Sequence, residues 1–289
     1  MAARKPKRKP INLALQGGGS HGAFTWGVLD RLLEDERLDI CGISGTSIGA
    51  INGAVIADGL TNGGHAHARD RLDHFWAEMG KLSYMSPIQR TLFSKMTDNW
   101  TLNHSPGVMM MDAITHTWSP YEFNPMNWNP LRDLIEREID FERVHACEEF
   151  SLFICATNVR TGKTKVFEGE EISADAIMAS ACLPEYFHAV EIDGEAYWDG
   201  GFMGNPPLYP LFYGTDCEDI LLVEVNPVEV GDVPKSAFAI ANRINEITFN
   251  STLLRELRVI EFVRRLIDEE KLDSRYMKVR MHEIRAAPE

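Results

Sequence analysis

The sequence predicts an α/β protein in which helices cover a mostly parallel central sheet. Residues 11–60 read in order as strand, glycine loop, helix, strand, turn and helix. Two more apolar, strand-like runs, SLFICATNV and ILLVEVNP, follow after residue 150. Because strands that are joined through helices pair in parallel, this order predicts a parallel sheet with helices packed on its faces.

The size and composition are those of an ordinary globular protein. The chain has 289 residues, of which 44% are hydrophobic and 25% are charged, enough for one large domain. No apolar run reaches the roughly 18 residues that span a bilayer. The basic start MAARKPKRKP leads into an apolar segment that is too short for the core of a signal peptide. We therefore expect a cytoplasmic protein.

The net charge of −14 is unevenly distributed. Residues 1–10 contain five Lys or Arg and no acid, so the remainder is more acidic than the total. Such a body repels phosphate polymers, which argues against nucleic acid as a partner. We expect residues 1–10 to form a basic flexible tail, with contact to anionic lipid as an alternative role.

The cysteines and histidines predict neither disulfides nor a metal site. The five cysteines are odd in number and include no C-x-x-C pair, and Cys41 and Cys155 lie in apolar strand-like runs. This usage is typical of reduced core thiols. His65 and His67 are close in sequence, but no third ligand stands nearby at a suitable spacing.

The first strand-like segment runs into a glycine-rich loop that allows two interpretations. The spacing G-x-G-x-x-G before a helix is that of a dinucleotide-binding loop, with Asp39 about where a ribose-binding acid would stand. Alternatively, the loop presents backbone N–H groups to the oxyanion of a tetrahedral intermediate. The loop consists of Gly17, Gly18, Gly19, Ser20, His21 and Gly22.

The second strand is followed by the pattern G-x-S-x-G, which favours the oxyanion interpretation. The pattern lies between a strand and a helix, the context of a nucleophile elbow. In such an elbow the serine occupies a strained turn, and the flanking glycines remove the Cβ atoms that would block the bend. Its residues are Gly45, Thr46, Ser47, Ile48 and Gly49, with Ser47 as the candidate nucleophile.

A serine nucleophile needs a base, and two candidates exist. Asp199 ends a short strand-like stretch and is followed by Gly200 and Gly201, which permit close approach of backbone and substrate. A Ser-Asp-His triad would instead require His282, the only histidine beyond Asp199. Ser47 lies too early in the chain for the usual α/β-hydrolase order, so the triad is disfavoured.

Together, GGGSHG at residues 17–22, GTSIG at 45–49 and DGG at 199–201 resemble the patatin-like phospholipases. The segment MASACLPEYFHAV is similar to the small-residue helix that precedes the family's aspartate strand. The resemblance covers about residues 11–210. It implies a three-layer α/β/α sandwich and a Ser47–Asp199 dyad that hydrolyses acyl esters of lipids without metal or nucleotide cofactor. His21 departs from the Arg or Lys usual in the family, so a structural hydrogen bond and pH tuning are both open roles for it.

In a Ser-Asp dyad, much of the transition-state stabilisation must come from the glycine loop. An aspartate with an ordinary pKa of about 3.9 is a weak base for an alcohol. We therefore expect the backbone N–H groups of Gly18, Gly19 and Ile48 to stabilise the oxyanion, each by about 2.7–4 kcal/mol. Thioesterase, acyltransferase and polyester depolymerase activities are alternatives with the same dyad, and a non-catalytic lipid-binding protein is a further one.

The domain boundaries follow from these motifs. We expect residues 11–235 to form the catalytic domain and residues 236–289 a helical segment packed on it. Residues 81–130 are rich in Met, Trp and Pro, which suits either a lid for lipid contact or a satellite core. The expected partners are a lipid or other hydrophobic acyl ester and, peripherally, a membrane; the sequence does not indicate an oligomeric state. In the C-terminal segment, helical spacing places six apolar side chains roughly on one face: Ile240, Ile244, Ile247, Leu254, Leu257 and Phe262.

Overall fold

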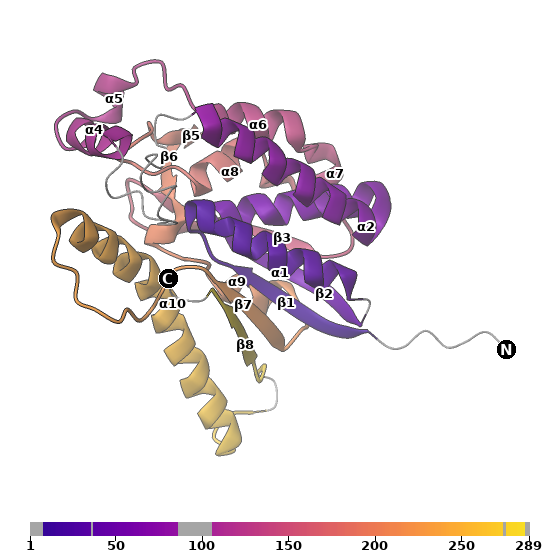
Figure 1. Cartoon of the computed structure of the whole chain (residues 1–289). Helices are drawn as coiled ribbons and strands as arrows, with labels where there is room; N and C mark the ends of the chain where they lie inside the picture. The colour runs from indigo at the N-terminus through magenta and orange to yellow at the C-terminus, as the bar shows by residue number, and fades with distance from the viewer. Residues whose placement is uncertain (1–7, 36, 86–105, 274–275, 287–289) are drawn as a thin grey trace.

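The computed structural model describes residues 8–35, 37–85, 106–273 and 276–286 (Figure 1). Its sheet has the strand order β5-β6-β3-β2-β1-β7-β8, and β4 pairs with β3 beside this path. Strands β1, β2, β3, β7 and β8 are parallel, whereas β4, β5 and β6 form antiparallel pairs. The bounds are β1 Lys9–Leu15, β2 Leu38–Thr46, β3 Ser151–Asn158, β4 Thr164–Glu168, β5 Val190–Ile192, β6 Glu195–Asp199, β7 Asp219–Glu224 and β8 Arg280–Arg285.

Helices cover both faces of this sheet, which confirms the predicted α/β class with a mostly parallel sheet (Figure 1). Short 3-10 turns η1, η2 and η3 span Gly19–His21, Gly169–Glu171 and Gly200–Phe202. The helices are α1 Gly22–Glu34, α2 Ile48–Met85, α4 Pro106–Thr115, α5 Pro120–Phe123, α6 Pro130–Glu138, α7 Phe141–His145, α8 Ala174–Ser180, α9 Tyr209–Gly214 and α10 Ala237–Asp268.

Side chains that alternate along the strands build a separate core on each face. Leu13 and Leu15 of β1 belong to the larger cluster, beneath α1, α2, α6, α7 and α8. Ala14, between them, belongs to a smaller cluster with Leu211 of α9 and Leu253 of α10. Because successive strand residues point to opposite faces, the two clusters fill the two interfaces between the sheet and its covering helices, as in a three-layer sandwich.

Helix α2 is a helical hairpin rather than one straight rod. The φ/ψ angles of Gly63 (−169°, 16°) and Gly64 (72°, −165°) are not helical, and the chain reverses between them. A Cβ on Gly59 would lie 2.5 Å from the Cα of Ala68, so the two arms pack closely there. His65 and His67 therefore belong to the start of the second arm.

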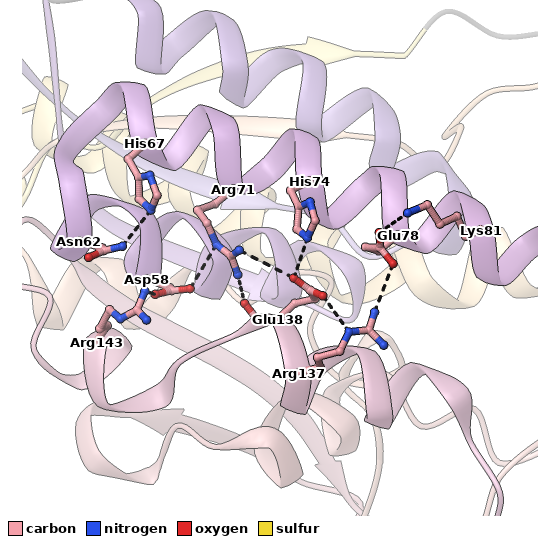
Figure 2. Close-up of polar contacts among 10 residues, drawn as sticks. All are labelled: Asp58, Asn62, His67, Arg71, His74, Glu78, Lys81, Arg137, Glu138 and Arg143. Atoms are coloured by element: carbon pink, nitrogen blue, oxygen red, sulfur yellow. Dashed lines mark hydrogen bonds and ion pairs between the residues drawn. The ribbon is translucent and has the colours of Figure 1, made fainter.

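Ion pairs fasten this hairpin to the following helices, as Figure 2 shows. Asp58, on the first arm, is 1% exposed and accepts a 2.9 Å hydrogen bond from Arg143 of α7. Arg71, on the second arm, pairs with Asp58 and with Glu138 of α6. His74 and Arg137 also contact the Glu138 carboxylate. Both buried carboxylates are thus paired, which offsets the cost of removing them from water.

The C-terminal segment differs from the prediction in two ways. Helix α10 begins after the N-cap Ser236, as expected, but residues 280–285 form β8, so a wholly helical segment is wrong. The strand forms because β7 has a free edge there, and Arg280 and His282 both contact Asp219 of β7. Of the apolar stripe that was expected on one face of α10, Ile240, Ile244, Ile247 and Phe262 are exposed, whereas Leu257 packs against the smaller core.

The segment rich in Met and Trp is described only in part. Its residues 86–105 lie outside the described residues, and with them part of the predicted lid. In the described part, Trp118, Met126 and Trp128 are 51%, 90% and 70% exposed. These three side chains therefore do not form a satellite core.

Candidate active site

Ser47 occupies the turn between β2 and α2 with a φ of 53°, a left-handed conformation that is rare for a residue with a side chain. The flanking positions 45 and 49 require glycine, because a side chain at either one would collide with neighbouring backbone. A Cβ on Gly45 would lie 2.7 Å from the backbone nitrogen of Ala50, and one on Gly49 would lie 2.2 Å from the carbonyl oxygen of Leu15. The Ser47 N–H donates a 2.8 Å hydrogen bond to Oγ of Ser180, at the end of α8.

Asp199 lies beside this turn because β2 and β6 end against the same side of β3. Thr46, the last residue of β2, pairs with Cys155, and Asp199, the last residue of β6, pairs with the next residue, Ala156. Both Cys155 and Ala156 also pair with β4, which must take the other side of β3. Thr46 and Asp199 therefore meet nearly end to end, and Ser47 follows Thr46 directly.

The Asp199 carboxyl group is buried, with 4% of the residue exposed. Burial raises its pKa to about 7, against the lowering effect of hydrogen bonds from the Gly201 N–H and the Ser47 hydroxyl. The Gly201 bond to Oδ1 is 2.7 Å long. The expectation of an ordinary, weakly basic aspartate is therefore wrong, because desolvation disfavours the carboxylate and makes it more basic.

The glycine loop lies against the elbow, but only part of it can donate outward. A Cβ on Gly17 would lie 2.9 Å from Cβ of Ser47, so the two segments touch. The Gly17 N–H donates to Oδ1 of Asn205 and the His21 N–H to the Gly18 carbonyl, so neither N–H is available to an oxyanion. Within the described chain, the N–H groups of Gly18, Gly19 and Ile48 donate to no protein acceptor.

The other members of the loop have different surroundings. Gly19 has a φ of 57°, and a Cβ there would meet nothing within 4 Å. A Cβ on Gly22 would lie 2.2 Å from the Ile48 side chain, so this glycine lets α1 start close to the elbow. Ser20 and His21 are exposed, and the His21 ring contacts no hydrogen-bonding partner within the described residues, so a structural hydrogen bond there is not found.

A network of buried carboxamides behind the loop was missed by the sequence analysis. Oε1 of Gln16 accepts 2.9 Å hydrogen bonds from the N–H groups of Val225 and Asn226, and Nε2 donates to Oδ1 of Asn250. The side chains of Asn226 and Asn205 both donate to the Gly17 carbonyl. A signal for two of these existed: Gln16 and Asn226 are polar residues directly after apolar strands, where parallel sheets place their sites.

Helix α10 also supports the loop that follows Asp199. The Phe249 ring packs edge-on against Phe202 at 5.1 Å, and a Cβ on Gly201 would lie 2.8 Å from Phe249. Oε2 of Glu256 accepts the N–H groups of Leu208 and Tyr209, which begin the next helix. The candidate site is therefore completed by a helix in which no site residue was predicted from the sequence.

The alternative readings of the motifs are not supported by the positions of their key residues. Asp39 pairs with Pro10 at the opposite end of β1 from the glycine loop, about 20 Å away at 3.3 Å per residue, too far for a shared ribose and phosphate site. His282 contacts Asp219 at 2.7 Å, near the amino end of β7, whereas Ser47 follows the carboxyl end of β2. Within the described residues, no group of three His, Cys, Asp or Glu side chains is arranged as metal ligands.

Comparison with known proteins gives one family and several distant relatives. A sequence model described as patatin-like phospholipase matches residues 13–212. Uncharacterized NTE family proteins of Mycobacterium bovis and Mycobacterium tuberculosis are 27% identical over 223 residues, which cover 76% of this chain and 50% of each relative. The chain thus spans about half the length of these relatives.

Two solved structures are similar at lower identity. VipD from Legionella pneumophila has 15% identity and a TM-score of 0.38, covering 82% of this chain and 52% of VipD. The ExoU–SpcU complex of Pseudomonas aeruginosa has 18% identity and a TM-score of 0.36, covering 88% of this chain and 52% of the matched chain.

No helix in the described parts of the chain is long and apolar enough to cross a membrane.

Proposed function

Given that this chain belongs to the patatin-like phospholipase family, we propose that it is a serine acyl hydrolase that cleaves acyl esters of lipids with Ser47 as nucleophile and Asp199 as base. The observation that carries the proposal is the position of Asp199, a buried carboxyl group whose pKa is raised to about 7, at the strand end that meets the turn of Ser47. A base is most effective when its pKa lies near the working pH.

In the first step, Asp199 accepts the Ser47 hydroxyl proton while Oγ forms a bond to the ester carbonyl carbon. The carbonyl oxygen becomes an oxyanion, and the unoccupied N–H groups of Gly18, Gly19 and Ile48 are the donors proposed for it. When the intermediate collapses, the bond to the leaving alcohol breaks and Asp199 returns the proton to that alcohol. The product is an acyl-Ser47 ester.

In the second step, Asp199 accepts a proton from water as the water oxygen attacks the acyl-Ser47 carbonyl. Collapse of this second intermediate breaks the bond to Oγ, and Asp199 protonates Ser47 while the fatty acid leaves. The residues proposed here perform both steps with one carboxyl group and one set of N–H donors. No metal or nucleotide takes part in this scheme.

The proposal is tested with a serine-directed fluorophosphonate and a substrate panel. The reagent should label the native chain once, at Ser47, and labelling that persists in Ser47→Ala would contradict the assignment. Phospholipids, lysophospholipids, acyl-CoA and p-nitrophenyl esters then identify the leaving group. Preference for acyl-CoA would indicate a thioesterase or acyltransferase, and turnover of none of them would favour a non-catalytic lipid-binding protein.

A further inference from the structure

One side of α10 is apolar and basic and lies in solvent. The isoleucines and the phenylalanine on it are 42–56% exposed, and its arginines are exposed as well. At 3.6 residues per turn, these positions fall within a sector of about 80° along the whole helix. We call this sector the outer face of α10; it consists of Ile240, Ile244, Ile247, Arg255, Arg258, Phe262 and Arg265.

The outer face is not needed to hold the helix on the domain. The opposite side of α10 carries Asn250, Leu253 and Ile260, which are 2%, 1% and 8% exposed and pack toward the sheet. Helix α10 thus has a complete buried side and, in addition, an apolar stripe in water. Exposed apolar residues that line up over several helical turns indicate a binding surface.

The charges on the outer face point to a negatively charged partner. Arg255, Arg258 and Arg265 have no ion-pair partner among the residues that the structure describes, although Arg243 and Arg264 of the same helix pair with Glu246 and Glu261. These arginines stand on a chain with a net charge of −14. A partner that complements the outer face must therefore combine negative charge with apolar surface.

The dimensions of the outer face favour a bilayer. From Ile240 to Arg265 the helix rises about 38 Å at 1.5 Å per residue, so the partner surface must be long. Amphipathic helices with basic and apolar side chains lie in the plane of anionic membranes, with the apolar groups at the boundary of headgroups and acyl chains. Arginine suits this position because its stem lies along apolar material while its head reaches phosphate.

We propose that the outer face of α10 docks on an anionic lipid bilayer. Ile240, Ile244, Ile247 and Phe262 enter the headgroup boundary, and the three arginines contact anionic headgroups. The inference rests on the proposed function, because the substrate would lie in the same bilayer. Phe249 and Asn250, on the buried side of α10, contact the Asp199 loop and the glycine-loop network, so docking brings the site to its substrate.

Cosedimentation with vesicles tests the docking independently of catalysis. Full-length protein carrying Ser47→Ala is mixed with vesicles of phosphatidylcholine alone or with added phosphatidylglycerol. We compare it with the double variants Arg255→Glu/Arg258→Glu and Ile244→Ser/Ile247→Ser. The matched control, Arg31→Glu/Lys163→Glu, reverses the same number of charges at exposed positions on α1 and between β3 and β4.

We expect binding to vesicles that contain phosphatidylglycerol, at least tenfold weaker binding for either α10 double variant, and little change for the control. In chains that retain Ser47, the α10 variants should hydrolyse a soluble ester at rates within twofold of the parent. A soluble-ester activity that survives Ser47→Ala would contradict the proposed mechanism but not the docking proposal, because vesicle binding is measured without catalysis.

Three results would overturn the docking proposal. The first is equal vesicle binding by the parent and both α10 variants. The second is loss of binding on removal of residues 1–9 with no effect of the α10 variants, which would assign the membrane contact to the basic tail. The third is the absence of vesicle binding together with a dimer, detected by light scattering, that dissociates in the variant Ile244→Ser/Ile247→Ser. The outer face would then bind a second copy of the chain.

Discussion

Oδ1 of Asn205 accepts a 2.7 Å hydrogen bond from the N–H of Gly17, a residue 188 positions earlier in the chain. The bond joins the loop after Asp199 to the glycine loop, and Nδ2 of Asn205 returns a bond to the Gly17 carbonyl. Since Gly17 also touches Ser47, one carboxamide holds together the three segments of the proposed site.

Asn205→Ala should lower kcat on a soluble ester by about 10–100-fold, because the glycine loop loses its anchor and its misplaced N–H groups forfeit part of the 10²–10³-fold that one oxyanion donor supplies. Stability should fall by about 1–3 kcal/mol, since the buried Gly17 N–H is left without an acceptor. Asn245→Ala, at an exposed position of α10, is the control. A variant that loses stability but keeps the parental kcat would show that the bond is only structural.

The pH dependence of hydrolysis should follow the ionisation of Asp199. The carboxylate is the proposed base and its pKa is raised to about 7, so kcat/KM should rise about tenfold per pH unit below 7 and level off above it. Asp199→Asn should be 10²–10⁴-fold slower, the usual loss for a general base, and should lack this transition. A parental profile that is flat from pH 5 to 8 would contradict a titrating Asp199.

The same group should make the folded chain less stable as pH rises. Asp199 keeps its proton in the folded state up to about pH 7 but loses it near pH 4 when unfolded, so the free energy of unfolding falls between these values. The Asp199→Asn side chain carries no charge at any of these pH values. The free energy of unfolding of this variant, relative to that of the parent, should therefore increase by about 3 kcal/mol from pH 5 to pH 8. Thermal unfolding at both pH values measures this gain. A constant difference between the two proteins would show that the carboxylate bears no burial cost.

Local geometry explains which parts of the site could be predicted from the sequence. Gly45 and Gly49 appear in the pattern because a Cβ at either position would collide with backbone, so the tight turn at Ser47 leaves a mark in the sequence. The order of strands and helices likewise determined the parallel sheet. The contact at Gly45 is with the nearby Ala50, whereas the contact at Gly49 is with Leu15 of β1, so the pattern records one short-range and one long-range constraint.

Features that depend on distant segments could not be predicted in this way. The pKa of Asp199 is raised by burial, which exists only after β6 has packed beside β2 and β3. The periodicity of α10 placed six apolar side chains on one face, but four of them are exposed and Leu257 instead packs on the smaller core together with Leu253. Strand β8 has too few residues and too much charge to stand out, and it forms because β7 offers an edge.

His282→Ala should change kcat by less than twofold. The His282 ring contacts Asp219, which is aligned through β1 with the start of β2, about 20 Å from Ser47 at 3.3 Å per residue. A Ser-Asp-His triad would require His282 at the nucleophile. Assays of purified, folded variants on one soluble ester decide the matter: an inactive His282→Ala beside an active Asp199→Asn would favour the triad.

Asn250→Leu tests whether α10, beyond the matched residues 13–212, contributes to catalysis. Asn250 is 2% exposed; it accepts from Gln16 and donates to the carbonyls of Asn226 and Pro227. Leucine has the same branched arrangement of heavy atoms but cannot form these bonds, so the segment that holds the Gly17 carbonyl loses its support. We expect kcat for a soluble ester to fall about tenfold and KM to stay unchanged. A tenfold loss corresponds to part of the roughly 2.7–4 kcal/mol of transition-state stabilisation that one oxyanion donor supplies.

Two further variants separate positioning from folding in this helix. Asn250→Asp can still accept the Gln16 bond but cannot donate to the two carbonyls, so its kcat should lie between those of the parent and Asn250→Leu. Asn245→Leu, at an exposed position, should match the parent. A purely structural role for Asn250 would lower the thermal stability of both Asn250 variants and leave kcat unchanged at temperatures where they are folded. A graded loss of kcat, without a change in KM, is the result that only a positioning role for α10 produces.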